Sequence, residues 1–434
     1  MRKEQKEWRK EQKDAPAKWD KLDNTANLFP VIAGEHMTNV FRMCVCLTED
    51  IRPELLQKAL EILLPWFQNF HSSLKKGFFW YYFEENRRKL PPVMEENTYP
   101  CQYFAPNSNQ NYLFRISYYK NRINLEVFHV LTDGSGARNF LRELTYQYLR
   151  LAHPELEQHG TTLSSETSLN REDSFLKNYR SYNFKAYNSP TAYLIKGERF
   201  RAHKMGIIHA SMNLKKFKEI AHKYNASINE YVVAVFFYSV YKEYLHGMPS
   251  KQPVSVGVPV DLRPFFDSDT TKNFFVVVSA YFKPEKEDYS FGEIVEIAKK
   301  SLRSQITKKQ LEEQFSFAVG NEKIMILRTI PLVFKNLGIR AFYKTAARKN
   351  SATITNVGSL KVKPEYEPYI TDYFCFLSRS YGQDIKACTS SYKNRLNITF
   401  SSVLKDTSIQ RCFYRHLAEE GLEISMETNG VYYG

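Results

Sequence analysis

The sequence HVLTDG, residues 129–134, lies between a strand-prone run and a helix-prone run. Residues 122–128 (RINLEVF) and residues 112–118 (YLFRISY) are separated by the turn at 119–121, and such a pair predicts a β-hairpin. A helix is predicted from about residue 137 to residue 151. His129 therefore stands where a strand ends and a loop begins, a place where a rigid element holds a side chain that a loop exposes.

His129 has the chemistry of a proton acceptor. The pKa of histidine is about 6.5, so a neutral imidazole can take up a proton at neutral pH. Asp133 can anchor the turn through an ion pair, and Gly134 permits a tight or left-handed backbone step. The spacing also allows a structural alternative, in which His129 is a core residue and Asp133 caps the helix. For a motif this short, the structural alternative is the more frequent one.

The motifs of several other enzyme classes are absent from the sequence. There is no GxSxG element, because GSG at 134–136 has a different spacing. A P-loop, an HExxH pair and a dinucleotide-binding fingerprint are also missing. These absences argue against a serine hydrolase, a nucleoside triphosphatase and a zinc protease.

The composition is that of an ordinary globular chain. The 434 residues are 43% hydrophobic and 25% charged, and the net charge is +14. A basic surface attracts phosphate-bearing cofactors, anionic lipid or nucleic acid, but no contiguous Lys/Arg block predicts a nucleic-acid partner. The six cysteines form no CxxC pair, so we expect no metal site and no disulfide framework. We therefore expect a reducing, cytoplasmic location.

The order of elements along the chain predicts an α/β fold. Residues 1–16 are a charged lead and do not resemble a secretory signal. No run approaches the ~18 apolar residues of a membrane span. Residues 52–70 carry leucines at helical spacing, with Pro53 suited to the first turn. Strands and helices are mixed in both halves of the chain, which favours two α/β layers side by side.

Three elements, in order, make the sequence similar to a known superfamily. The pattern at 129–134 is followed by PVDLRPFF (259–266) with NFF (273–275), and later by TNVG (355–358). Together they resemble the chloramphenicol acetyltransferase-like superfamily of HxxxDG acyltransferases, and residues 18–430 look most like its bacterial alcohol acetyltransferase-like members. Phe128 stands where many members carry a first histidine. The Asp-Phe-Gly-Trp-Gly element of the plant-type branch is absent, which argues against that branch.

The resemblance implies a fold and a reaction. The fold is two similar chloramphenicol acetyltransferase-like α/β sandwich domains with a channel between them. We expect an N-terminal half at 17–190, which carries the motif, and a C-terminal half at 191–434. The implied reaction moves an acyl group, acetyl in the alcohol acetyltransferases, from a thioester such as acyl-CoA to a small-molecule alcohol or amine. Acyl-CoA is then a co-substrate, and no bound cofactor is expected.

The resemblance also implies a role for each site residue. His129 is the general base, and no acyl-enzyme forms. Asp133 is structural and pairs with an arginine, for which Arg263 is the candidate, in the same element as Asp261. Asn356 either donates a hydrogen bond to the oxyanion or supports the turn beside Gly358, and the sequence does not decide between the two.

Other functions fit the same sequence. One is a non-catalytic binding protein on the same fold, and another is a condensation-type enzyme that uses carrier-protein thioesters. A third is a membrane-surface protein, because residues 328–349 mix apolar and basic residues at roughly helical spacing. For that segment we favour a helix that faces the core and has a solvated basic edge.

Overall fold

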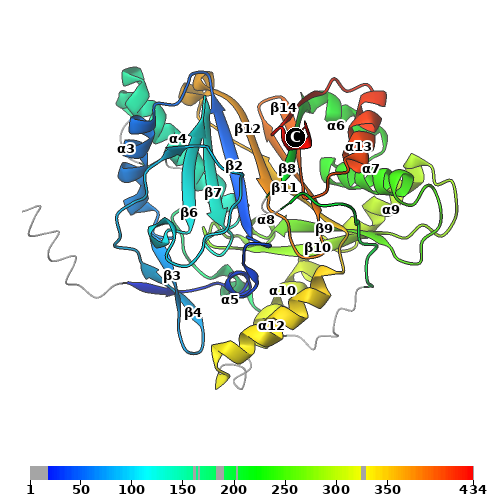
Figure 1. Cartoon of the computed structure of the whole chain (residues 1–434), viewed down its shortest axis with the longest axis horizontal. Coiled ribbons are helices and arrows are strands. Elements are labelled where there is room, and N and C mark those ends of the chain that lie inside the picture. The colour runs from blue at the N-terminus through cyan, green and yellow to red at the C-terminus, as the bar shows by residue number, and fades with distance from the viewer. Residues whose placement is uncertain are drawn as a thin grey trace, which may run out of the picture.

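The computed structural model of the chain describes residues 18–159, 163–164, 167–181, 190–201, 204–323 and 329–433. The predicted lead at 1–16 lies outside these residues. The described strands form a five-stranded, a seven-stranded and a small three-stranded sheet. Figure 1 shows the two larger sheets in two lobes that stand side by side. The predicted α/β fold with two lobes is confirmed.

The first lobe is built on the five-stranded sheet, in the order β12-β2-β7-β6-β5. Helix α4 packs on β2 and β7, and α3 packs on α4. The hairpin predicted at 112–128 is present, with β6 ending at Tyr119 and β7 beginning at Arg122. The elements of this half are β1 (Trp19–Lys21), α2 (Phe29–Ile32), β2 (Val40–Leu47), α3 (Pro53–Leu63), β3 (Ser72–Lys76), β4 (Tyr81–Glu85), β5 (Met94–Glu95), β6 (Phe114–Tyr119), β7 (Arg122–Phe128), α4 (Gly134–Ala152) and α5 (Ser174–Asn178).

Helix α3 begins as predicted and ends earlier than predicted. Pro53 occupies its first turn, and Leu56, Leu60 and Leu63 are buried at helical spacing. The α-helix stops at Leu63 and continues only as a short 3-10 turn that contains Pro65. A proline has no N–H to donate to the preceding turn and its ring clashes with the carbonyl four residues earlier, so the helix cannot extend to residue 70.

The second lobe is built on the seven-stranded sheet, in the order β10-β9-β11-β13-β14-β8-β15. Its central helix α7 is buried along most of its length and packs against α9 and α13. The elements are β8 (Gly206–Asn213), α6 (Leu214–Lys223), α7 (Ile228–Glu243), β9 (Val254–Asp261), α8 (Arg263–Phe266), β10 (Phe275–Phe282), α9 (Phe291–Arg303), α10 (Lys308–Lys323), α12 (Leu332–Ala347), β11 (Ala352–Ser359), β13 (Ile385–Tyr392), β14 (Arg395–Ser402), α13 (Ser408–Glu419) and β15 (Ser425–Thr428).

One strand from the second half of the chain lies in the sheet of the first lobe. Strand β12 (Ile370–Leu377) pairs antiparallel with β2, with Phe374 opposite Cys44. It also packs against β13 and β14 of the other sheet. The two lobes are therefore joined by β12, which comes from the second half of the sequence and lies in the sheet of the first lobe. The predicted boundary between the two halves at residue 190 stays a prediction.

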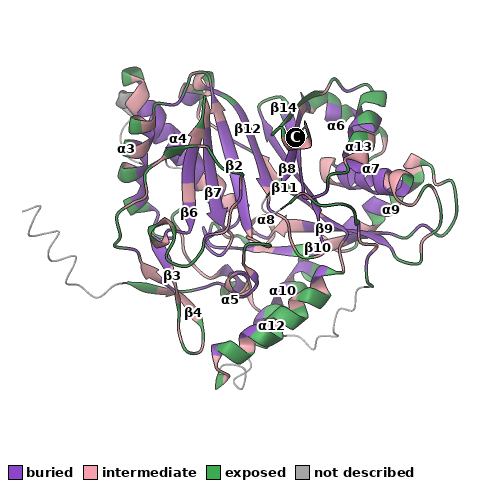
Figure 2. Cartoon of the chain, viewed as in Figure 1, coloured by how far each residue is buried: buried purple, intermediate pink, exposed green. Residues whose placement is uncertain are grey.

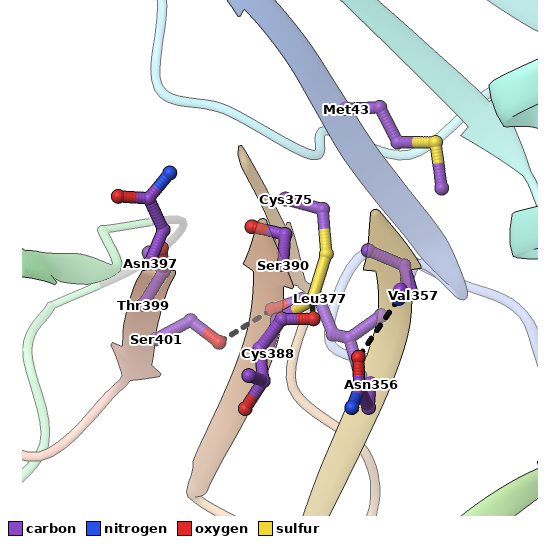
Figure 3. The surroundings of a disulfide bond; sticks show 12 residues. Met43, Asn356, Val357, Cys375, Leu377, Cys388, Ser390, Asn397, Thr399 and Ser401 are labelled. Atoms are coloured by element: carbon purple, nitrogen blue, oxygen red, sulfur yellow. Dashed lines mark hydrogen bonds between the residues drawn. A yellow bond between two sulfur atoms is a disulfide. The ribbon is translucent and has the colours of Figure 1, made fainter. Parts of the chain in front are cut away.

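A disulfide joins β12 to β13. Cys375 and Cys388 are bonded, with their Cα atoms 6.1 Å apart, and Figure 3 shows the bond between the two strands. The expectation that the cysteines form no disulfide is wrong for this pair. No local pattern indicates this bond, because the two residues meet only where strands of different sheets pack together. Cys44, Cys46, Cys101 and Cys412 are free.

Helix α12 leaves several large apolar side chains exposed and buries only Leu332 and Ala347 among its apolar residues. Phe334 and Leu337 are 64% and 60% exposed, and Figure 2 shows most of this helix as exposed. The expectation that residues 328–349 form a helix that faces the core is therefore wrong. Residue 328 lies outside the described residues. No helix in the described ranges is long and apolar enough to cross a bilayer.

Candidate active site

His129 lies at the end of β7, and its ring is enclosed by aromatic side chains. Its backbone N–H donates to the carbonyl of Asn39 at 2.9 Å. The imidazole stacks on Phe29 with the ring centroids 4.6 Å apart, and Phe41 and Phe275 lie at 5.0 and 5.4 Å. Burial lowers the pKa of His129 below its usual value of 6.5, although its polar contacts partly oppose this effect. The imidazole is therefore neutral at neutral pH.

The amide of Asn273 sets which nitrogen of His129 carries the proton. Its Nδ2 and its backbone N–H donate to Oδ2 of Asp23, at 3.1 and 3.2 Å. The amide oxygen must then face Nδ1 of His129, which lies 3.1 Å away. A carbonyl oxygen only accepts, so Nδ1 carries the hydrogen in the neutral ring and Nε2 keeps a lone pair.

Asp23, which is buried between β1 and α2, completes this chain of contacts. Its Oδ1 accepts from the backbone N–H of Ala26 at 2.7 Å. Burial raises the pKa of Asp23 to about 7, although its N–H donors lower it. The sequence reasoning did not assign a role to Asn273 or Asp23. The sequence features that could have indicated them were the position of Asn273 shortly after the Asp-x-Arg element and the presence of Asp23 in the segment before the first long strand.

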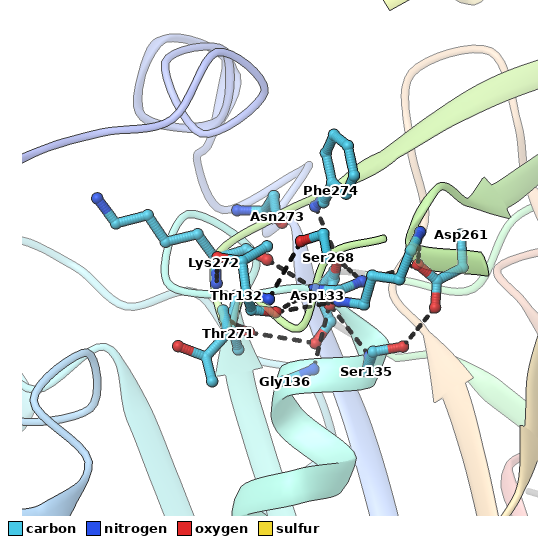
Figure 4. A network of polar contacts seen from close by, with 12 residues as sticks. Thr132, Asp133, Ser135, Gly136, Asp261, Ser268, Thr271, Lys272, Asn273 and Phe274 are labelled. Carbon is cyan, nitrogen blue, oxygen red and sulfur yellow. Dashed lines mark hydrogen bonds and ion pairs between the residues drawn. The ribbon is translucent and has the colours of Figure 1, made fainter. Parts of the chain in front are cut away.

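Asp133 forms the predicted ion pair with Arg263. The guanidinium binds both carboxylate oxygens, at 2.9 and 3.1 Å. The carboxylate also accepts from the N–H groups of Ser135, Gly136 and Phe274. Burial alone raises the pKa of Asp133, but Arg263 and these donors hold it below its ordinary value. With this many donors the carboxylate is ionised and held in one orientation. Figure 4 shows Asp133 among these polar contacts.

Arg263 ties this network to the segment Thr270–Phe274, which precedes β10. Its guanidinium donates to the carbonyls of Thr270 and Lys272, and also to Oδ1 of Asp261 at 2.9 Å. Asp261 in turn accepts from the hydroxyl of Ser135 at 2.9 Å, so α4 is held to the end of β9. The segment that carries Asn273 is thus fastened to the loop that carries His129.

Two glycines, Gly134 and Gly136, lie at the start of α4, and the role predicted for Gly134 is not the one that the structure shows. Gly134 does not adopt a left-handed conformation, and a Cβ there would meet Val357 at 3.4 Å, an ordinary contact. At Gly136 a Cβ would lie 2.0 Å from the hydroxyl of Thr132 and 2.6 Å from the carbonyl of Thr271. Gly136 is therefore the glycine that the close approach of the two segments requires, and the sequence reasoning missed it.

Replacing Gly136 with alanine is expected to lower the free energy of unfolding by about 3 kcal/mol, because the added methyl displaces a backbone carbonyl that cannot move freely. The hydrogen bond from the hydroxyl of Thr132 to the carbonyl of Thr271, 2.6 Å long, would break as well. Urea denaturation measures the change. The matched control is Gly134→Ala, for which a change of less than about 1 kcal/mol is expected; equal losses for the two variants would contradict this assignment.

Asn356 lies in a bulge of β11 and is engaged on both sides of its amide. Its Oδ1 accepts from the N–H of Gly358 at 2.8 Å, and its Nδ2 donates to Asn229 at 2.7 Å. Gly358 has a φ of +72°, which the turn requires. The turn-supporting contact is present, and Asn229 is the one acceptor found for this amide among the described residues. The oxyanion role of Asn356 stays a proposal.

A cavity of about 550 Å³ lies between the lobes beside these residues. Its lining includes His129 and Ser135 from the first lobe, Asp261 and Asn356 from the second, and Cys375 of the disulfide. The cavity is large enough for a small-molecule ligand. In the described part of the chain, no cluster of histidine, cysteine and acidic residues could hold a metal ion.

The same cavity is lined by a buried lysine that the sequence reasoning missed. Lys386 on β13 is 8% exposed, and its Nζ donates to the hydroxyl of Ser380 at 2.6 Å. Burial lowers the pKa of Lys386 to about 7. A signal was available, since it is the only charged residue in the strand IKACTSSY (385–392).

Comparison with known proteins finds similar folds among solved structures. No family model and no curated protein matches the chain. Among solved structures, the first condensation domain of the CDA synthetase aligns with a TM-score of 0.63 at 12% identity, over 94% of this chain and 99% of that one. TRI101 of F. sporotrichioides, complexed with coenzyme A and T-2, aligns with a TM-score of 0.60 at 13% identity, over 94% and 99%.

A third solved structure has a similar fold. TRI3 trichothecene 15-O-acetyltransferase from Fusarium sporotrichioides aligns with a TM-score of 0.59 at 7% identity, over 92% of this chain and 94% of that one. All three alignments span nearly the full length of both chains. The chain therefore has the two-lobed α/β fold that these condensation and acetyltransferase structures share.

Proposed function

We propose that the protein is an acyltransferase that moves an acyl group from a thioester to a hydroxyl or amine acceptor in the cavity between the lobes. The observation that carries the proposal is the state of His129. Its Nδ1–H is held by Asn273, and no described residue donates to or accepts from its Nε2. A neutral imidazole with a free nitrogen, beside a cavity, is the arrangement that a general base requires.

The proposed reaction uses His129 as the only group that moves a proton. Nε2 takes the proton from the acceptor O–H or N–H as the acceptor atom attacks the thioester carbonyl. The tetrahedral intermediate collapses with loss of the C–S bond, and the imidazolium returns its proton to the thiolate. In this scheme Asp133 and Arg263 hold the loop in place, and Asn356 donates its remaining N–H to the oxyanion.

The donor we propose is acyl-CoA, with acetyl as the first acyl group to test. TRI101 was crystallised with coenzyme A, and TRI3 is named as an O-acetyltransferase. At 13% and 7% identity these structures support the fold and leave the donor of this chain as a proposal. The net charge of +14 favours a donor that carries phosphates.

A thiol-release assay tests the function. Acetyl-CoA and octanoyl-CoA are each incubated with pools of alcohols and of amines, and free coenzyme A is read with a thiol reagent. We expect release that depends on the acceptor and is lost in His129→Ala. Release that is equal in the variant, or that never exceeds hydrolysis in any pool, would overturn the proposal.

A condensation-type function is the second candidate, because one of the similar structures is a condensation domain. Such an enzyme accepts the acyl group from a phosphopantetheine arm on a carrier protein. The S-acetyl thioester of N-acetylcysteamine contains the end of that arm without the nucleotide of coenzyme A. Faster turnover with this thioester than with acetyl-CoA would favour the carrier-protein donor.

Replacing Asn273 with alanine is expected to lower kcat by about 10²-fold, because the imidazole loses the contact that sets its tautomer and its orientation. The lost contact also supports the protonated ring, so the acid limb of the pH–rate profile should move to lower pH. The measurement is kcat against pH for both proteins. A loss of kcat without a shifted limb would mean that Asn273 acts only through the fold.

A further inference from the structure

One side of helix α12 packs against the rest of the protein, and the other side, which carries apolar residues, faces solvent. Leu332, Asn336 and Ala347 are buried, and Tyr343, on the same side, lines the cavity between the lobes. Helices in soluble proteins turn their apolar stripe toward the core. Here the opposite side carries Val333, Phe334, Leu337 and Phe342, which are 58 to 74% exposed.

The tip of the β3–β4 hairpin extends this apolar side. The N–H of Leu332 donates to the carbonyl of Phe78 at 2.8 Å, and Nζ of Lys335 donates to the carbonyl of Phe79 at 3.0 Å. Figure 1 shows the hairpin and α12 projecting from the same edge of the molecule. At this tip Phe78 and Trp80 are 70% and 52% exposed. We call the exposed set the aromatic face: Phe78, Trp80, Val333, Phe334, Leu337 and Phe342.

The charges within α12 and the hairpin tip are basic, although Lys75 at the tip pairs with Glu84 at 3.0 Å. Helix α12 contains Lys335, Arg340 and Lys344 and no acidic residue, and the sequence has none between Glu322 and Glu365. The hairpin tip adds Lys75 and Lys76, and no acidic residue occurs from 75 to 83. Large exposed apolar patches mark interaction sites. Aromatic side chains between cations are the composition that binds an anionic membrane surface.

We propose that the aromatic face docks on an anionic lipid bilayer, with α12 lying in the plane of the interface and the hairpin tip inserted. A second copy of the chain fits the face less well, because it would bring cations against cations, and lysine is depleted in protein–protein interface cores. Docking would place the cavity wall formed by Tyr343 beside the bilayer. Docking on lipid is a binding event alone and does not depend on the proposed acyl transfer.

Vesicle flotation tests the proposal. The full-length protein is mixed with vesicles of phosphatidylcholine and phosphatidylglycerol, and with vesicles of phosphatidylcholine alone, at low and high salt. We expect flotation with the anionic vesicles that weakens as salt is added, because screening reduces the attraction to the surface. A wild-type protein that stays at the bottom with anionic vesicles at low salt would overturn the proposal.

Two variants separate the apolar and electrostatic parts of binding. Phe334→Ser with Leu337→Ser should lower the partition coefficient by about tenfold or more, because two large side chains no longer enter the interface. Lys344→Gln should lower it by about fivefold, and only on anionic vesicles. These side chains are exposed, so the fold should be retained, which circular dichroism checks.

The matched control exchanges two exposed apolar residues away from the aromatic face. Met248 and Met426 are 50% and 57% exposed, and Met248→Ser with Met426→Ser should bind vesicles like the wild type. If Phe334→Ser with Leu337→Ser also binds like the wild type, the face is not the docking surface. If that variant instead converts a dimeric wild type to a monomer, and neither protein floats, the face is an interface between copies and the lipid proposal is wrong.

Discussion

Replacing His129 with alanine is expected to lower kcat/KM for acyl transfer by about 10²–10⁴-fold while the melting temperature changes little. The variant loses the group that accepts the proton, while the ion pair between Asp133 and Arg263 and the sheets of both lobes remain. The measurement is thiol release with the acceptor found in the screen, together with thermal denaturation. Turnover equal to that of the wild type would remove His129 from the reaction.

A second histidine provides the matched control for this variant. His209 on β8 is 8% exposed, lies against Phe374 with the ring centroids 4.2 Å apart and the rings tilted by 39°, and does not line the cavity. His209→Gln should retain turnover. If it does, the loss in His129→Ala is due to the missing base and not to the removal of a buried imidazole in general.

The pH dependence of the wild type follows from the same residue. The base acts only when the imidazole is neutral, so turnover is complete above the pKa of His129 and falls as the pH drops through it. Because burial lowers that pKa, the acid limb should lie below pH 6.5. An acid limb above that value would mean that another group controls the rate.

Replacing Asp133 with asparagine is expected to lower the free energy of unfolding by about 3–5 kcal/mol and to reduce turnover as well. The substitution leaves the guanidinium of Arg263 buried without its bidentate carboxylate, and removing one partner of a buried ion pair is costly. The loop that holds His129 would lose its anchor at the same time. Urea denaturation and the thiol-release assay measure the two effects, and unchanged unfolding would contradict the anchoring role.

Asp261 provides the control, because it binds the same guanidinium from a more exposed position. Its side chain is 40% exposed, against 6% for Asp133. Asp261→Asn should therefore cost about 1 kcal/mol or less. Acid titration offers a further check: the pKa of Asp133 is lowered in the fold, so its contribution is present above pH 3.8 and is lost as the pH falls through the folded pKa.

The sequence predicted the parts of the site that depend on neighbouring residues. A hairpin followed by a helix placed His129 at a strand end, because alternating apolar residues and a turn determine those elements locally. The ion pair between Asp133 and Arg263 was also predicted, but from the resemblance to a superfamily and not from local pattern. The catalytic roles of His129, Asn356 and the other site residues stay predictions until activity is measured.

Tertiary structure decided the rest, for a physical reason. The contact between Asn273 and Asp23 joins residues 250 positions apart, and that between His129 and Asn273 joins residues 144 apart. The disulfide and the requirement for Gly136 arise where separate segments pack together. Helix α12 has an ordinary mix of apolar and basic residues, and which side faces solvent depends on the hairpin and cavity wall that it packs against. The local sequence determined the position of His129, and long-range packing determined its tautomer, its anchor and the exposed aromatic face beside its cavity.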